Sequence, residues 1–123
     1  MLIVDTHAAL WFLEGDRRLS RAARRVIEDD RAERLLSAVS VIEVAVKRRL
    51  GKLDMSADFY EAMYRQGLRG LPVTDRHARR LADLPLHHRD PFDRLLVAQA
   101  QVEGMAILSA DERLRAYDVP ILW

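Results

Sequence analysis

The sequence predicts an α/β fold in which a parallel sheet is covered by helices on both faces. The chain has 123 residues, enough for one domain and too few for two, so residues 1–123 are expected to form a single domain. Hydrophobic residues make up 50% and charged residues 32%, the balance of an ordinary globular protein. Short apolar runs alternate with segments of helical periodicity. Strands that alternate with helices favour right-handed βαβ units and therefore a parallel sheet.

The apolar runs give the expected strands. Each is a short run of branched or long apolar side chains without helical spacing. Pro72 lies in the third run and favours an edge position there, because proline cannot donate to a sheet ladder. The expected strands are residues 2–4, 35–39, 71–73 and 106–108, with 121–122 as a short fifth.

Helical periodicity and end signals predict the helices between these strands. Gly15, Gly51, Gly67 and Gly104 each follow a periodic segment and are expected to end it. The charged second segment carries apolar side chains at helical spacing, which predicts an amphipathic helix with a solvated face. The expected helices are residues 6–14, 20–34, 41–50, 56–66, 77–84 and 92–103.

Composition excludes several classes of function. The chain has no cysteine, which excludes a disulfide scaffold, thiolate-bound zinc and a cysteine nucleophile. No apolar run approaches the roughly 18 residues of a membrane span, and the N-terminal segment lacks signal-peptide features, so the cytoplasm is the expected location. The net charge of +1 gives no global electrostatic case for nucleic-acid binding. Motifs for ATP, dinucleotides or a serine nucleophile are absent from the sequence.

Four acidic residues follow one positional rule. Asp5 and Asp111 directly follow the first and fourth expected strands. Glu43 is expected in the first turn of the helix that follows the second strand, and Asp93 in the first turn of the helix over residues 92–103. In a parallel sheet, strand ends and the starts of the helices behind them share one edge. The four carboxylates are therefore expected near the crevice where doubly wound sheets bind ligands.

Each acid also has an ordinary structural explanation. Asp5 and Asp111 suit helix N-caps, Ser40 to Glu43 has the pattern of a capping box, and Glu43 with Lys47 suits an i,i+4 ion pair. Convergence favours a functional role, because capping does not require carboxylates to gather at one point. Gathered carboxylates repel each other, and a divalent cation would remove the repulsion.

The type of ligand indicates the cation and its chemistry. Oxygen ligands suit Mg²⁺ or Mn²⁺. Such an ion lowers the pKa of a bound water and neutralises charge that builds on a phosphate, while carboxylates hold the ion and orient the water. The histidines lack zinc-site spacing: His87 and His88 are expected on the surface, and His7 either lines the rim of the cleft or is an ordinary half-buried histidine. The histidines are His7, His77, His87 and His88.

Four segments resemble a VapC-type subgroup of PIN-domain proteins. They are LIVDTHAALW (2–11), SAVSVIEVAVK (37–47), HRDPFDRLLVAQA (88–100) and LSAD (108–111). Their order, their spacing and the chain length agree with that subgroup over essentially the whole chain. The resemblance implies a three-layer α/β/α sandwich with a parallel, doubly wound sheet. It also implies a Mg²⁺- or Mn²⁺-dependent endoribonuclease that is the toxin of a type II toxin–antitoxin system.

The resemblance implies roles for the acids. Asp5 and Asp93 would be the principal metal ligands, and Glu43 and Asp111 would complete the shell or act through water. Asp90 is an extra acid near the third motif, expected first as a helix cap and second as a ligand.

The resemblance also implies partners. They are an RNA substrate, a cognate VapB-type antitoxin whose C-terminal segment blocks the site, and a second copy in a homodimer; no membrane is expected. Thr6 and Ser109 match positions where the family places hydroxyls beside the acids. Candidates for the antitoxin groove or the dimer face, which core packing would also explain, are Trp11, Phe12, Phe59 and Tyr60. Candidates for contacts with RNA phosphates, which solvated helix surface would also explain, are residues 17–18, 24–25 and 47–49.

Two other functions remain open at the level of the sequence. A PIN-like module that has lost catalysis and only binds a partner would share this fold, although all four acids are present. A receiver-like phosphoacceptor domain would have a similar length and acidic pocket. It would need an aspartate at a mid-chain strand end and a late lysine, whereas the chain has Glu43 there and no lysine after Lys52.

Overall fold

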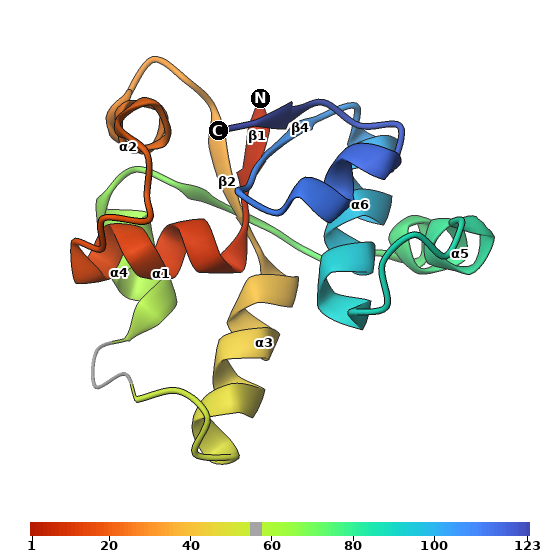
Figure 1. The fold of residues 1–123 in the computed structure, drawn as a ribbon, viewed down its shortest axis with the longest axis horizontal. Coiled ribbons are helices and arrows are strands. Elements are labelled where there is room, and N and C mark those ends of the chain that lie inside the picture. Colours follow the sequence, from red (N-terminus) through yellow and green to blue (C-terminus); the bar gives the residue numbers. More distant parts are fainter. Residues whose placement is uncertain (55–57) are drawn as a thin grey trace.

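Five short parallel strands form the central sheet of this computed structural model, which describes residues 1–54 and 58–123 (Figure 1). Along the sheet the order is β3-β2-β1-β4-β5. The chain moves outward from β1 to β3 on one side and then from β4 to β5 on the other, so the winding reverses between β1 and β4. This is the doubly wound arrangement that the sequence predicted. The strands are β1 (Leu2–Val4), β2 (Arg34–Ser37), β3 (Arg69–Leu71), β4 (Ala106–Leu108) and β5 (Ile121–Leu122).

Helices cover both faces of the sheet, which confirms the three-layer α/β/α architecture. In Figure 1, α1, α2 and α4 lie on one side, α5 and α6 lie on the other, and α3 extends away from the end of the sheet where β2 finishes. The bounds of the helices are α1 (Thr6–Glu14), α2 (Arg21–Glu28), α3 (Ala38–Arg49), α4 (Phe59–Arg65), α5 (Asp75–Asp83), α6 (Pro91–Glu103) and the 3-10 helix η1 (Glu112–Ala116).

Successive side chains along each strand point to opposite faces of the sheet, and the interior is therefore divided into two cores. In β1, Val4 packs with the helices α1, α2 and α4, while Ile3 packs with α6 and η1. The same alternation holds in β2 and β4, as expected for strands buried on both faces. Side chains of the first core include Leu36, Leu108, Ala9 and Ile27, and those of the second include Leu35, Ile107, Leu96 and Leu114.

The start of α3 differs from the prediction. Its N-cap is Ser37, whose hydroxyl accepts a hydrogen bond from the backbone N–H of Val39 at 3.0 Å, so β2 ends before Ala38. The capping box expected at Ser40 is therefore wrong. Ser40 lies inside the helix, where its hydroxyl accepts a hydrogen bond from Thr6. Glu43 consequently lies in the second turn of α3 and not in the first.

Other boundaries also differ from the prediction, and α5, for example, begins at Asp75 and not at residue 77. The amphipathic helix α2 ends at Glu28 and not at residue 34, and β3 lies over Arg69–Leu71 and not over 71–73. α4 begins at Phe59 after its N-cap Asp58, and Ser56, the expected start, lies outside the described residues. In the part of the chain that is described, no helix has the length and apolar character needed to cross a membrane.

Candidate active site

Asp5 lies at the point where the winding of the sheet reverses. Val4, at the end of β1, pairs with Leu36 on one side and Leu108 on the other, so Asp5 emerges between the carboxyl ends of β2 and β4. It is 5% exposed and caps α1 by accepting a hydrogen bond from the Ala8 N–H at 2.7 Å. Burial raises the pKa of Asp5, although hydrogen bonds from Ser109 and Ala8 oppose the rise.

Asp93 is in the first turn of α6, as predicted, and faces the same crevice. Burial raises its pKa to about 7, and the carboxylates of Asp90, Glu43 and Asp5 add to the rise, while His88 opposes it. The carboxylates of Asp5, Glu43 and Asp93 therefore lie close enough to repel each other. Asp90 caps α6 by accepting from the N–H groups of Phe92 and Asp93 at 2.8 and 3.2 Å, the first of its two expected roles.

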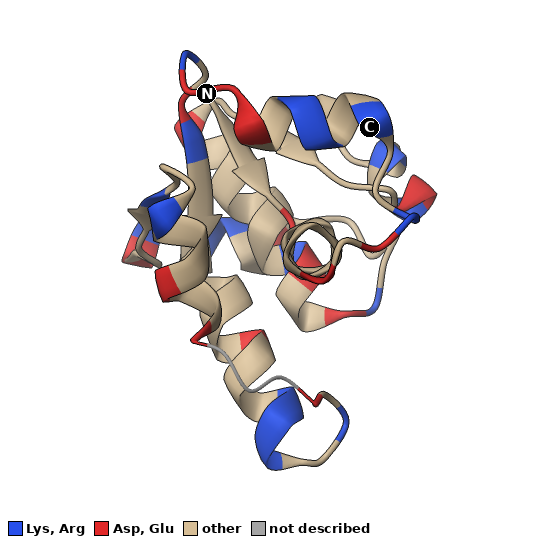
Figure 2. Ribbon diagram, turned by 90° about the vertical axis from the view of Figure 1, so that its left-hand side faces the viewer, with Lys and Arg blue, Asp and Glu red and all other residues tan. Residues whose placement is uncertain are grey.

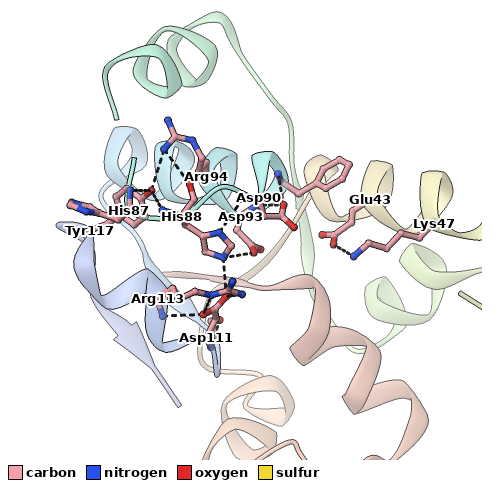
Figure 3. Close-up of polar contacts among 12 residues, drawn as sticks. Glu43, Lys47, His87, His88, Asp90, Asp93, Arg94, Asp111, Arg113 and Tyr117 are labelled. Carbon is pink, nitrogen blue, oxygen red and sulfur yellow. Dashed lines mark hydrogen bonds and ion pairs between the residues drawn. The ribbon is translucent and has the colours of Figure 1, made fainter. Parts of the chain in front are cut away.

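Glu43 reaches the site from α3 and is 1% exposed. Its Oε2 accepts a hydrogen bond from Lys47 at 2.5 Å, which confirms the i,i+4 pair (Figure 3). Its Oε1 is buried and has no hydrogen-bond partner among residues 1–54 and 58–123. A buried carboxylate oxygen without a partner is costly, so this atom fits a position beside a cation or a cation-bound water.

Asp111 follows β4 and caps η1, where its Oδ1 accepts from the Arg113 N–H at 3.0 Å. The Arg113 guanidinium also donates to Oδ2 at 2.9 Å. Partial burial raises the pKa of Asp111, but hydrogen bonds from Arg113 and His88 outweigh it and hold the pKa at about 2. Two carboxylates of the same crevice, Asp93 and Asp111, thus have opposite tendencies to bind a proton.

His88 was expected on the surface, and the structure corrects this. The side chain is buried between α6 and the segment after β4, with Nε2 at 3.1 Å from Asp93 Oδ2 and 3.0 Å from Asp111 Oδ2 (Figure 3). Its Nδ1 accepts a hydrogen bond from the Asp90 N–H at 3.1 Å. His87, in contrast, is exposed as predicted. The available signal was the position of His88 two residues before the N-cap of α6.

The loop that carries His88 is fixed by Tyr117. The Tyr117 hydroxyl oxygen accepts hydrogen bonds from the backbone N–H groups of His88 and His87 at 3.0 and 3.2 Å. Arg94 donates to the same oxygen at 3.2 Å and to the Pro85 carbonyl at 2.9 Å. The backbone of this loop is therefore tied both to α6 and to the end of η1.

A cleft opens over three of the four predicted acids, and Glu43 is not part of its lining. Its lining includes Asp5, Asp93 and Asp111, together with Trp11 and Arg18 on one side. An adjoining hollow shares part of this lining and extends toward α3. The cleft is also lined by His7, Asp90 and Arg113, and the hollow by His7, Trp11, Arg18, Lys47 and Lys52. Acids at the bottom of the cleft thus have cations on its rim.

Other candidate residues divide between the cleft and the core. Trp11 packs against the first core and also lines the cleft, with the Arg18 guanidinium 4.8 Å from its ring centroid. Phe12 packs against the same core and Phe59 is buried in it, whereas Tyr60 is exposed beside an apolar hollow next to β3. His7 is exposed on the rim of the cleft, one of its two expected positions.

These features define a class of protein: a doubly wound parallel α/β domain with an acidic site where the winding reverses. The chain belongs to the PIN domain family, which it matches over residues 2–120. It is 28% identical over 122 residues to "Ribonuclease VapC22" of Mycobacterium tuberculosis, an alignment that covers 97% of this chain and 93% of that protein. The resemblance to VapC-type PIN-domain proteins is thereby confirmed.

Solved structures share the fold at low sequence identity. A toxin–antitoxin complex from Klebsiella pneumoniae contains a chain with a TM-score of 0.71 and 14% identity, covering 100% of this chain and 97% of that chain. VapBC2 from Rickettsia felis bound to a promoter DNA fragment gives a TM-score of 0.70 and 9% identity, covering 98% of this chain and 96% of that chain.

Proposed function

We propose that this protein is a metal-dependent endoribonuclease that cleaves RNA phosphodiester bonds and is the toxin of a type II toxin–antitoxin pair. The observation that carries the proposal is the buried Oε1 of Glu43, which lacks a partner among the described residues, together with Asp5 and Asp93, which line one cleft. A cation beside these acids would offset the repulsion between their charges and supply a partner for that oxygen. The similarity to a protein named as a ribonuclease supports the choice of substrate.

The donor set suits Mg²⁺, with Mn²⁺ as an alternative. Asp5 and Asp93 would hold the ion, and Glu43 and Asp111 would complete its surroundings directly or through water. When bound, the ion supplies an activated water and neutralises charge on the scissile phosphate. Lys47 holds one oxygen of Glu43, which leaves the other free to orient a water or accept its proton.

The cations on the rim would bind the substrate. Arg18 and Arg113 line the cleft itself, and Lys47 and Lys52 line the adjoining hollow. The guanidinium groups of the two arginines can bind phosphate oxygens in pairs, and the ammonium groups of the two lysines would add positive charge beside the RNA backbone.

We also propose an antitoxin partner of the VapB type, because the structural neighbours are toxin–antitoxin complexes. The expected homodimer stays a prediction, which light scattering of the purified protein tests. The family match leaves no basis for the receiver-like alternative.

The test of catalysis is the Asp5→Asn variant. Asparagine caps helices as well as aspartate does, so α1 should remain capped while a metal ligand is weakened. We expect Mg²⁺-dependent RNA cleavage to fall at least about 100-fold with a far-ultraviolet circular dichroism spectrum like that of the unaltered protein. The matched control is Asp58→Asn, at the exposed N-cap of α4, which should cleave normally.

Two results would count against the proposal. Full cleavage by the Asp5→Asn variant removes Asp5 from the mechanism. An unaltered protein that binds a VapB-type antitoxin but cleaves no RNA with Mg²⁺ or Mn²⁺ indicates the partner-binding module instead.

A further inference from the structure

His88 is buried at the junction of two carboxylates that come from distant parts of the chain. Asp93 belongs to α6 and Asp111 follows β4, and the single atom Nε2 of His88 lies within 3.1 Å of an Oδ2 atom of each (Figure 3). The side chain is 3% exposed. No other part of the proposed mechanism uses this ring.

The position of the ring hydrogen follows from the opposite side of the imidazole. Nδ1 accepts a hydrogen bond from the backbone N–H of Asp90 at 3.1 Å, so Nδ1 must present a lone pair and cannot carry a hydrogen. The hydrogen of the ring therefore lies on Nε2, which is hydrogen-bonded to Asp111 Oδ2 at 3.0 Å and lies 3.1 Å from Asp93 Oδ2.

This tautomer decides between two roles. Nε2 of His88 and oxygens of Asp93 and Asp111 lie within 4.8 Å of one another, close enough for all three to bind one ion. A nitrogen that carries a hydrogen has no lone pair for a metal, however, so the ring can donate to Asp111 but cannot act as a third ligand.

The backbone that carries the ring is also held in place. The backbone N–H of His88 donates to the Tyr117 hydroxyl at 3.0 Å, and Arg94 binds the same oxygen at 3.2 Å. The donor is therefore in place before a cation binds. Because it is already ordered, cation binding does not have to offset the conformational entropy of ordering it.

We propose that His88 is a positioning residue, whose Nε2–H holds the carboxylate of Asp111 in place beside Asp93 for a divalent cation without ligating it. The inference rests on the proposed function for the cation, but it concerns a contact that can be measured without RNA.

The first experiment measures Mn²⁺ affinity by isothermal titration calorimetry in the unaltered protein and in two variants. His88→Gln retains an N–H donor, and His88→Leu fills the space without one. We expect the leucine variant to lose about 10–100-fold in Mn²⁺ affinity and the glutamine variant to lose less than about 5-fold. His87→Leu, in the exposed neighbour, is the matched control and should leave the affinity unchanged.

Equal losses in both His88 variants would mean that the donor does not matter and would overturn the inference. A gain in affinity in His88→Leu would also overturn it, because the ring would then compete with the cation. An unaltered protein that takes up no Mn²⁺ overturns both this role and the proposed metal site. Normal Mn²⁺ uptake without RNA cleavage would refute only the proposed nuclease.

The second experiment needs no variant and is independent of their folding. A long-range ¹H–¹⁵N spectrum of the metal-free protein distinguishes the two neutral tautomers of His88. We expect the hydrogen on Nε2 both before and after saturation with Mg²⁺. A hydrogen on Nδ1, or loss of the Nε2 hydrogen when Mg²⁺ is added, would contradict the positioning role and indicate a ligand.

Discussion

Asp93 binds a proton more tightly in the folded chain than in the unfolded chain, since burial and the neighbouring acids raise its pKa from 3.8 to about 7. The folded state therefore holds an extra proton between these values, and the associated stability is lost as the pH rises through that window. We expect Asp93→Asn to raise the free energy of unfolding of the metal-free protein by about 1–4 kcal/mol at pH 8 and by less at pH 5. Urea denaturation at the two pH values measures the difference.

The pKa of Asp111 is shifted in the opposite direction, so its effect on stability has the opposite pH dependence and serves as the comparison. Its pKa is lowered to about 2, chiefly because hydrogen bonds from Arg113 and His88 outweigh the effect of burial, so its charge stabilises the fold above pH 4 and that stability is lost as the pH falls toward 2. We expect Asp111→Asn, which keeps an N-cap for η1, to lower the free energy of unfolding at pH 8 by about 1 kcal/mol after solvent screening. Stabilisation by both substitutions would show that general charge removal, and not the particular surroundings of Asp93, controls stability.

At the scale of residues, position in the chain predicted more than side-chain environment did. Asp5 and Asp111 could be placed because a residue that follows a parallel strand must lie at the carboxyl edge of the sheet. The environment of His88 could not be predicted, because its burial depends on Tyr117, which is 29 residues further along the chain. The sequence shows that His88 is two residues from Asp90, but it does not indicate that the loop folds toward the interior.

Arg34 connects elements that the sequence pattern treats as separate. It begins β2, its side chain is 2% exposed, and its guanidinium donates to the Ile27 carbonyl at the end of α2 and to the Gln66 carbonyl that follows α4. The final carbonyls of a helix lack partners within the helix, so Arg34 satisfies groups at two helix ends together. We expect Arg34→Met to lower the free energy of unfolding by about 2–4 kcal/mol, measured by urea denaturation.

The control for this prediction is the exposed partner of the same arginine. Asp30 lies 3.3 Å from the Arg34 guanidinium but is 91% exposed, so Asp30→Asn should cost less than about 1 kcal/mol. A cost as large as that of Arg34→Met would show that the ion pair, and not the bonds to the carbonyls, accounts for the effect.

Elements with strong internal signals were predicted well, and those defined by their neighbours were not. α6 has Asp90 as its N-cap, Pro91 in its first turn and Gly104 in the left-handed conformation at its end, and its expected bounds agree with the structure to one residue. The end of α2 was misplaced because Arg34 suits a helix locally and is recruited to β2 by the carbonyls of other elements. Propensity alone does not decide a residue whose partners are distant.

At the scale of the whole molecule, a net charge of +1 conceals a local separation of charge. Acids converge at the carboxyl edge of the sheet, whereas the last turn of α3 carries Lys47, Arg48 and Arg49, the basic turn at the lower end of Figure 2. Lys52 lies just beyond this turn and lines the hollow that adjoins the acidic cleft. The net charge of the chain therefore does not predict whether this edge binds a polyanion, because binding depends on where the cations lie.

Lys52 is the side chain that tests this arrangement, because it lines the hollow and lies apart from the acids. In an Asp5→Asn background, which we expect to bind RNA without cutting it, Lys52→Ala should weaken affinity for single-stranded RNA about 3–10-fold and reduce the slope of log affinity against log salt by about 0.7. Fluorescence anisotropy at several salt concentrations measures both quantities. The matched control is Arg65→Ala on α4, an exposed cation paired with Glu61 outside the lining of the cleft and the hollow. A decrease in affinity and salt slope with Arg65→Ala as large as that with Lys52→Ala would show that the overall charge of the protein attracts the RNA and that the RNA does not bind along the hollow.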